Sequence, residues 1–187
     1  MSDHKTKNIK KHPEKNEQEN TLNVNIIIDT REKRPWEFKK TPSGMNVSNI
    51  YHDKLDAGDY CLLGLEFPNQ NFSVIVERKA KMEEFLGNIG SNWKRFKREL
   101  EKLSEFKRPL IIVEDDMSKA YARYKSSRGR RKGYFNLPPE FIIKRISEIY
   151  IDYGVPVFFA SSRSMGERFA LNFFKRATKM EEALDGE

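Results

Sequence analysis

The sequence has few of the side chains that most often bind zinc or form covalent cross-links. Its 187 residues include one cysteine, Cys61, and three scattered histidines. A single cysteine excludes a disulfide within the chain and a cysteine-rich zinc site. The sequence also lacks a Walker loop, a dinucleotide-binding glycine pattern and an internal repeat. Any catalytic or binding chemistry is therefore expected from other residue types.

Long apolar runs are absent as well. No stretch approaches the run of about 18 apolar residues that a membrane-spanning helix requires, so no membrane partner is expected. The N-terminus has no apolar segment of the kind found in secretory signals. These absences predict an intracellular protein, in the cytoplasm of a bacterium or of a phage-infected cell, or in a nucleus.

Charge, by contrast, is abundant and predominantly positive. Charged residues make up 34% of the chain, which carries a net charge of +7. A basic balance favours an anionic partner, with nucleic acid first among the candidates, although charge can also serve solubility alone. Hydrophobic residues make up 37% of the chain and include 13 Phe, enough to form a core.

The length fits one domain, which we expect over residues 23–180. Residues 1–22 and 181–187 are expected to be disordered tails, because they contain too few apolar residues to offset the entropy of ordering. Within the domain, β-branched runs predict strands and apolar spacings of three and four predict helices. Strands are expected at 24–28, then as a three-strand meander at 45–55, 59–67 and 72–79, and at 109–114 and 155–161; helices are expected at 82–106, 137–153 and 162–180, with a further short helix after 115.

The strand that ends in Glu77, Arg78 and Lys79 is unusual, because three charges follow the apolar run 74–76 directly. Alternate residues of a strand share a face, so Glu77 and Lys79 point the same way and Arg78 points the other way. A hairpin would bring Asp59 beside Glu77. Two carboxylates at one point repel each other unless a cation lies between them. The pattern predicts a metal site, although a surface ion pair is the commoner role of such a pair.

Other carboxylates are expected at the same rim of the sheet. Asp29 ends the first strand, Glu32 follows it, and Glu83 and Glu84 begin the long helix. With oxygen ligands and no Cys or His cluster, Mg²⁺ or Mn²⁺ is favoured over zinc. Several carboxylates and one lysine are therefore expected to gather at this rim, with Asp59, Glu77, Glu83 and Asp29 as the candidate metal ligands.

Two basic segments are candidates for contacts with DNA phosphates. The first is the long helix, which carries Lys94 and Arg98 on its polar face, where a solvated surface is the alternative. The second is a Ser- and Gly-rich loop that contains four cations and no neighbouring acid. A guanidinium-rich loop of this kind is typical of phosphate binding. The loop residues are Arg128, Arg130, Arg131 and Lys132.

These motifs resemble the signature of the XPF/Mus81 structure-specific endonucleases. Gly58-Asp59 is followed about 17 residues later by Glu77-Arg78-Lys79, and "IIIDTREKRP" is similar to that family's first strand. The resemblance extends from about Val24 to Met180. It implies an α/β fold, namely a restriction-endonuclease-like three-layer domain with a central mixed sheet flanked by helices. It also implies a divalent-metal-dependent DNA endonuclease that cuts branched, flap or fork DNA and takes part in repair or recombination.

The resemblance also implies roles for individual residues. Asp59 and Glu77 would be metal ligands, and Lys79 would be the catalytic lysine. Arg78 completes the signature. Asp29 and Glu32 would be supporting acids, and Arg31 would lie near the phosphate. The final Asp of the family's signature aligns with Glu83, a departure that adds one methylene, and Glu84 is a candidate to share its role.

The family further implies partners and leaves two alternatives open. A twofold homodimer is expected through the C-terminal part of the domain. Family members usually carry a helix-hairpin-helix region, so a partner protein that supplies one is also expected. The first alternative is a non-catalytic DNA-binding or scaffold subunit of a heterodimeric nuclease; such subunits usually lose the acidic residues that this chain keeps. The second is a sequence-specific restriction-type nuclease, for which no recognition domain is visible.

Overall fold

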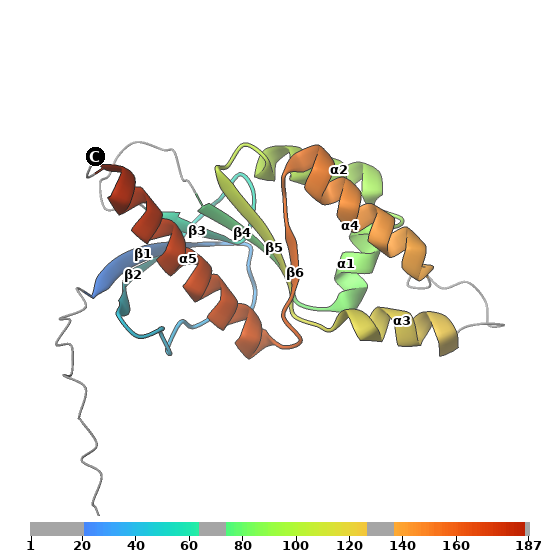
Figure 1. Cartoon of the computed structure of the whole chain (residues 1–187), viewed down its shortest axis with the longest axis horizontal. Coiled ribbons are helices and arrows are strands. Elements are labelled where there is room, and N and C mark those ends of the chain that lie inside the picture. The colour runs from blue at the N-terminus through green and yellow to red at the C-terminus, as the bar shows by residue number, and fades with distance from the viewer. Residues whose placement is uncertain (1–20, 64–73, 127–136, 186–187) are drawn as a thin grey trace, which may run out of the picture.

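The structure is a computed structural model that describes residues 21–63, 74–126 and 137–185. These residues form a mixed six-stranded sheet in the order β2-β1-β3-β4-β5-β6, flanked by helices (Figure 1). The strands are β1 (Leu22–Asp29), β2 (Met45–Asp53), β3 (Tyr60–Leu63), β4 (Val74–Lys79), β5 (Arg108–Val113) and β6 (Val157–Phe159). The helices are α1 (Met82–Ile89), α2 (Trp93–Leu103), α3 (Met117–Ser126), α4 (Pro139–Tyr153) and α5 (Arg163–Asp185).

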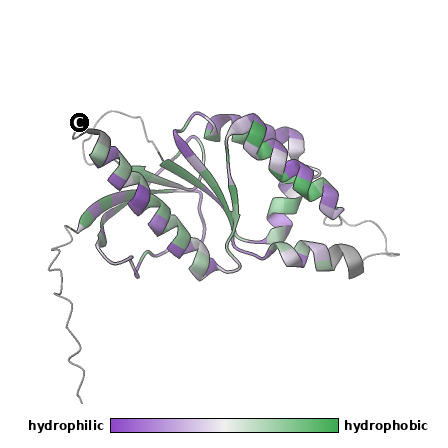
Figure 2. Ribbon diagram, viewed as in Figure 1, coloured by the Kyte–Doolittle hydropathy of each residue, from purple (hydrophilic) through white to green (hydrophobic). Residues whose placement is uncertain are grey.

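The two faces of the sheet carry separate cores, because alternate strand residues point to opposite sides. One core joins the sheet to α1, α2, α3 and α4, with Ile75 and Ile111 among its strand residues. The other joins the sheet to α5, with Val76 and Ile112 among its strand residues. Figure 2 shows the strands largely hydrophobic and the helices mixed, as expected where each helix buries one face. This layering is the predicted three-layer α/β fold.

The predicted three-strand meander is wrong in one respect. β3 and β4 form the expected antiparallel pair, but β2 pairs parallel with β1 at the outer edge of the sheet. Burial explains the order. All four residues of β3 are buried, as is typical of a central strand, whereas Met45 is the only buried residue of β2. A strand so exposed is suited to an edge.

The single helix predicted over 82–106 is also wrong, because it is two helices, α1 and α2. The backbone leaves the helical region at Gly90, where φ is −98° and ψ is −105°. The apolar spacing nevertheless holds across the break, since Phe85, Ile89, Phe96 and Leu100 belong to the same core. The break turns α2, so that one side of it faces the end of β4.

The helix predicted over 137–153 and the two elements after it are present. Proline opens α4 within its first turn, and Gly154 ends it in a left-handed conformation with φ of 67°. α5 continues to Asp185, five residues beyond the predicted end of the domain at 180. Glu181 accounts for part of this extension, because its carboxylate pairs with Lys107 at 3.1 Å and also with Arg108. Of the N-terminal tail predicted over 1–22, residues 1–20 lie outside the described residues, and Leu22 is the buried first residue of β1.

Among the helices that the structure describes, none combines the length and the apolar character needed to cross a membrane.

Candidate active site

The strand directions gather the sequence-predicted acids at one end of the sheet, where several strands finish. β1, β4 and β5 run in the same direction and finish at this end, whereas β3 is antiparallel and begins there. Asp29 therefore lies at the end of β1, Asp59 just before β3, and Glu77 to Lys79 at the end of β4. The predicted hairpin does bring Asp59 level with Glu77, since its neighbour Tyr60 pairs with Val76.

Asp59 is held in place by its backbone. Its N–H donates to the Val76 carbonyl and its own carbonyl accepts from the Asp29 N–H, each at 2.8 Å. Gly58 makes this entry possible with φ of +70°, and a Cβ there would lie 2.5 Å from Cγ1 of Ile75. The carboxylate is then fixed by the Arg78 N–H, which donates to Oδ2 at 2.7 Å.

Lys79 is a buried cation beside Glu77. Its Nζ lies 2.5 Å from Glu77 Oε1 and 3.6 Å from Glu84 Oε1, and 5.5 Å from the centre of the Phe96 ring. Burial alone would lower the pKa of Lys79, but the neighbouring carboxylates outweigh it and hold that pKa above its ordinary value. Lys79 is therefore an ammonium at neutral pH.

Asp59 and Glu77 form an electrostatically strained pair. Burial, followed by repulsion from Glu77, raises the pKa of Asp59 well above its ordinary value. A cation between two such carboxylates would relieve the repulsion. Mg²⁺ is commonly held by one or two carboxylates, with water and substrate phosphates completing its shell. Asp59 and Glu77 fit that requirement, and among the residues described no three His, Cys, Asp or Glu side chains are grouped to hold a metal alone.

Asp29 and Arg31 form an ion pair at the same end of the sheet as Asp59 and Glu77. Asp29 is buried, and its two oxygens accept from Arg31 Nε at 2.8 Å, from Arg31 Nη2 at 2.7 Å and from the Leu55 N–H at 2.8 Å. Burial alone would raise the pKa of Asp29, but these hydrogen bonds outweigh it and hold that pKa below its ordinary value. This geometry makes Asp29 a support for Arg31; its role as a metal ligand stays a prediction.

Arg78 faces away from Glu77 and Lys79, as alternation predicts, and enters a buried network. Its Nε and Nη2 donate to the two oxygens of Glu114 at 2.8 and 2.7 Å. Glu32 lies 3.2 Å from Arg78 Nη1, and the Trp36 indole N–H donates to Glu114 at 2.5 Å. Sequence reasoning missed Glu114 and Trp36. The available signal was that Glu114, like Glu77, directly follows a buried apolar run of a strand.

Of the two adjacent acids Glu83 and Glu84 at the start of α1, Glu84 is the one that lines the cavity. Glu84 lines the cavity around Asp59 and Glu77, and its Oε2 accepts from the Ala80 N–H at 3.2 Å. Glu83 precedes it on α1 but does not line this cavity. The metal-ligand role predicted for Glu83 is not tested by this arrangement and stays a prediction.

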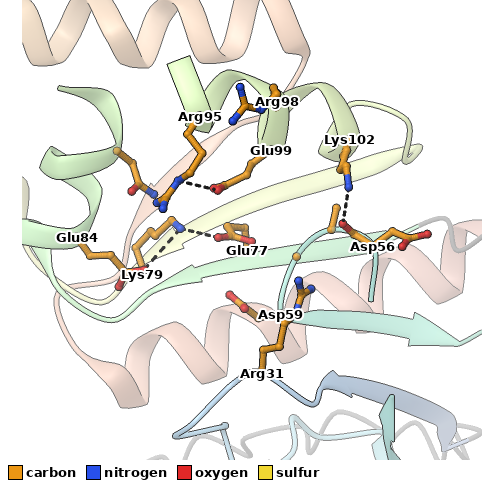
Figure 3. Close-up of a pocket in the computed structure, with 13 residues that line it drawn as sticks. Arg31, Asp56, Asp59, Glu77, Lys79, Glu84, Arg95, Arg98, Glu99 and Lys102 are labelled. Carbon is orange, nitrogen blue, oxygen red and sulfur yellow. Dashed lines mark hydrogen bonds and ion pairs between the residues drawn. The ribbon is translucent and has the colours of Figure 1, made fainter. Parts of the chain in front are cut away.

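These residues surround a cavity of about 500 Å³ between the end of β4 and α2. Figure 3 shows Lys79 between Glu77 and Glu84, with Arg95, Arg98 and Glu99 across from Asp59 and Arg31. Arg98 lines this cavity, and its contact with a DNA phosphate stays a prediction. Lys94 is exposed on α2 but does not line the cavity. The predicted basic loop with Arg128, Arg130, Arg131 and Lys132 lies outside the described residues.

Comparisons with known proteins bear on the family and the fold. The sequence matches the family model of the ERCC4 domain over residues 28–173. The fold is similar to that of XPF from Aeropyrum pernix in complex with DNA, with a TM-score of 0.53 and 20% identity over 84% of this chain and 66% of that one. A second structure of XPF from Aeropyrum pernix gives a TM-score of 0.51 and 20% identity over 82% of this chain and 61% of that one. The chain thus spans less than two thirds of the length of these proteins.

A comparison with curated protein sequences finds no match. The structural likeness establishes the restriction-endonuclease-like fold, and the family match covers most of the chain and both halves of the signature. The resemblance to the XPF/Mus81 nuclease domain is thereby confirmed, and the chain belongs to the ERCC4-domain family.

Proposed function

We propose that the chain is a divalent-metal-dependent endonuclease that hydrolyses phosphodiester bonds in DNA. The observation that carries this proposal is the cavity in which Asp59, Glu77 and the buried ammonium of Lys79 meet beside the cations of α2. Membership of the ERCC4-domain family and the likeness to an XPF that was solved with DNA support DNA as the substrate.

Asp59 and Glu77 are the residues that would hold Mg²⁺ or Mn²⁺. A bound divalent ion would polarise a phosphoryl oxygen and favour ionisation of a bound water. The chain contributes the placement of the two carboxylates: Gly58 and the Arg78 N–H fix Asp59, and Lys79 fixes Glu77. Because these contacts exist before substrate arrives, little reorganisation is needed for the reaction.

Lys79 acts as a hydrogen-bond donor and a positive charge. Its pKa is raised above the ordinary value, so it does not serve as a general base near neutral pH. Its ammonium can orient the attacking water and stabilise the negative charge that develops on the phosphate. Arg31, whose side chain is 61% exposed, adds a guanidinium at the same end of the sheet for a phosphate oxygen.

The preferred substrates are branched, flap or fork DNA, and the active form is a homodimer joined through the C-terminal part of the domain. A partner protein would supply helix-hairpin-helix binding to DNA. Backbone contacts dominate such a site, so binding depends little on base sequence. The basic residues Arg128, Arg130, Arg131 and Lys132 are proposed to contribute phosphate contacts.

The decisive experiment combines a substrate panel with one substitution. Labelled duplex, flap, fork and four-way-junction DNAs are incubated with the protein, with and without Mg²⁺ or Mn²⁺. Single-turnover cleavage at saturating protein then compares wild type with Lys79→Ala. We expect Lys79→Ala to bind DNA within a few-fold of wild type and to cut at least about 10²-fold more slowly, because a positioned catalytic group is removed.

Lys40→Ala is the matched control, because Lys40 is exposed and lies outside the cavity. Cleavage by Lys79→Ala at the wild-type rate would show that the lysine is structural and that the mechanism is wrong. Binding of branched DNA by wild type without cleavage under any metal condition would instead favour the non-catalytic subunit.

A further inference from the structure

A second cavity meets the one described above at the candidate catalytic residues. The first, here called the α2 lobe, has a volume of about 500 Å³ and is bounded by Arg95, Arg98 and Lys102 of α2. The second, here called the loop lobe, has a volume of about 430 Å³ and is bounded by Lys33 and Arg34 of the segment after β1. Both are lined by Arg31, Asp59, Glu77 and Glu84.

The loop lobe is a built surface, because its backbone is anchored at several points. The Arg34 carbonyl accepts from Arg78 Nη1 at 3.1 Å and from Arg163 Nη1 at 2.8 Å. The Pro35 carbonyl accepts from Arg163 Nη2 at 2.5 Å, and the Arg34 N–H donates to Glu32 at 2.7 Å. The side chains of Lys33 and Arg34 are left exposed on this fixed backbone. They are therefore available to an anion at little cost in backbone entropy.

The α2 lobe is equally anchored, by the opposite face of its helix. Phe96 and Leu100 of α2 are fully buried in the core, which fixes the orientation of Arg98 and Lys102 on the other side. Arg98 and Lys102 are one turn apart and point to the same cavity. Lys102 also donates to the Asp56 carbonyl at 3.4 Å (Figure 3).

Cations on both sides offset the negative charge at the place where the two lobes meet. The residues that line both lobes, here called the shared rim, include Asp59, Glu77 and Glu84, whose charges repel a phosphate. Cations on one side alone would draw a DNA strand away from this rim, whereas cations on both sides draw it across. The reacting groups are also recessed, since the side chain of Lys79 is 5% exposed and that of Glu77 is 14% exposed. A duplex is stiff over about 150 base pairs, whereas a single strand can bend into such a recess.

We propose that a single DNA strand crosses the site from the α2 lobe to the loop lobe, with the scissile phosphate at the shared rim. Arg98 and Lys102 contact phosphates on one side of the cut, and Lys33 and Arg34 contact phosphates on the other side. The inference rests on the proposed endonuclease function and adds the path of the substrate strand to it.

Binding to a single strand tests the two lobes without cleavage. Fluorescence anisotropy of a labelled oligothymidylate about 12 nucleotides long, within the length that one single-strand-binding groove covers, is measured in EDTA over a series of salt concentrations. The variants are Lys33→Ala with Arg34→Ala, Arg98→Ala with Lys102→Ala, and all four together. Lys40→Ala and Lys97→Ala are matched controls, because both residues are exposed and line neither lobe. Circular dichroism verifies that each variant is folded.

We expect each two-residue variant to weaken binding about tenfold or more. Each should also reduce the salt slope by about 0.7 for every phosphate that the variant no longer binds. In the four-residue variant the two fold-losses in affinity should multiply and the two changes in slope should add. The inference is overturned if either lobe's variant binds like its control. Because this measurement needs no metal and no cut, its failure is distinct from failure of the cleavage panel, which tests the endonuclease function itself.

A second measurement tests the path. Neutral methylphosphonates replace single phosphates on either side of the mapped cut in a cleaved substrate. A methylphosphonate on one side should remove the effect of the loop-lobe variant on the cleavage rate, and one on the other side should remove that of the α2-lobe variant. If both variants respond to phosphates on the same side, the strand does not cross the rim and the proposal is wrong.

Discussion

Asp59 illustrates how one residue can serve a site at a cost to the fold. Burial and the charge of Glu77 raise the pKa of its carboxyl, so the folded state resists its ionisation. Wild type therefore loses stability as the pH rises above the unfolded-state pKa of about 3.9 and through the higher folded-state pKa. Asparagine keeps the shape of the side chain and does not titrate.

We accordingly expect Asp59→Asn to have a larger free energy of unfolding than wild type at pH 7, and the two proteins to converge below about pH 4. Urea unfolding in metal-free buffer across this range measures the difference, with Asp152→Asn on the exposed side of α4 as the control. A variant that is less stable than wild type at pH 7 would contradict the proposed repulsion between Asp59 and Glu77.

The position of Asp59 also depends on Gly58, the residue before it. Alanine at this position would combine a positive φ of +70° with a Cβ 2.5 Å from the buried side chain of Ile75. Left-handed strain alone costs roughly 1–2 kcal/mol, and the clash adds to it. Gly154 supplies a matched control, because its φ is +67° and a Cβ there would have no atom within 4 Å.

We expect Gly58→Ala to lower the free energy of unfolding by more than Gly154→Ala, which should cost about 1 kcal/mol. Chemical denaturation of both variants measures the two decreases. Equal decreases would mean that the contact with Ile75 is relieved without cost and that Gly58 is needed for its backbone conformation only.

At the scale of elements, the end of β4 is a junction between both faces of the sheet. Glu77 and Lys79 face the cavity, whereas Arg78 crosses to the other core and pairs with Glu114 at the end of β5. Trp36 closes this network and stacks on Tyr60 with ring centres 4.3 Å apart. The same Arg78 whose N–H fixes Asp59 is thus held by β5 and by the segment after β1.

We expect Glu114→Ala to reduce the free energy of unfolding by about 3 kcal/mol, because the buried Arg78 guanidinium loses its two-bond carboxylate partner and keeps Glu32 and the Arg34 carbonyl. Arg78→Ala combined with Glu114→Ala should cost less than the sum of the two single substitutions. A double-mutant cycle by urea denaturation measures this coupling. Additive effects would show that the two side chains do not stabilise each other.

The local sequence pattern predicted the strands and helices better than it predicted which strands pair and where a helix breaks. The run 74–76 followed by charge identified β4 and the shared face of Glu77 and Lys79, because strand alternation is a local property. The position of β2 could not be obtained this way, since whether a strand is central or at an edge depends on which other strands it meets. The break between α1 and α2 keeps the apolar spacing, so periodicity alone does not reveal it.

In the candidate site, too, contacts between nearby segments were predictable and contacts between distant segments were not. Asp59, Glu77 and Lys79 lie in adjacent or paired segments, and the predicted hairpin was enough to bring them together. Glu114 is separated from Arg78 by 36 residues, and only the parallel pairing of β4 with β5 makes them neighbours. The choice of Glu84 over Glu83 at the cavity depends on how α1 is rotated, which tertiary packing decides.

At the scale of the whole molecule, the sheet has two unlike edges. β2 forms one edge and β6 the other. β6 lies between two helices, because Phe158 stacks on Phe169 of α5 with ring centres 3.6 Å apart and Phe159 meets Phe85 of α1 on the opposite face. Large apolar side chains are exposed on the helices that follow β5 and β6. They include Ile143, Tyr150 and Ile151 of α4 and Met165 of α5.

Exposed apolar residues on elements that flank an edge strand are suited to a twofold interface, in which each patch meets its copy. This is the surface on which we expect the proposed homodimer to form, since it belongs to the C-terminal part of the domain. Light scattering after size-exclusion chromatography should give about 44 kDa, twice the chain mass of 22.0 kDa. Ile151→Lys places a charge at the most exposed of these residues, whose exposed fraction is 76%.

We expect Ile151→Lys to shift the protein toward the monomer, because burying an unpaired ammonium in an apolar interface is unfavourable. Ile50→Lys is the matched control, since Ile50 is an exposed isoleucine on β2 at the opposite edge of the sheet. The control should leave the dimer intact. A monomeric wild type at micromolar concentration, or a dimer that resists Ile151→Lys but not Ile50→Lys, would place the interface elsewhere and remove α4 from the proposed assembly.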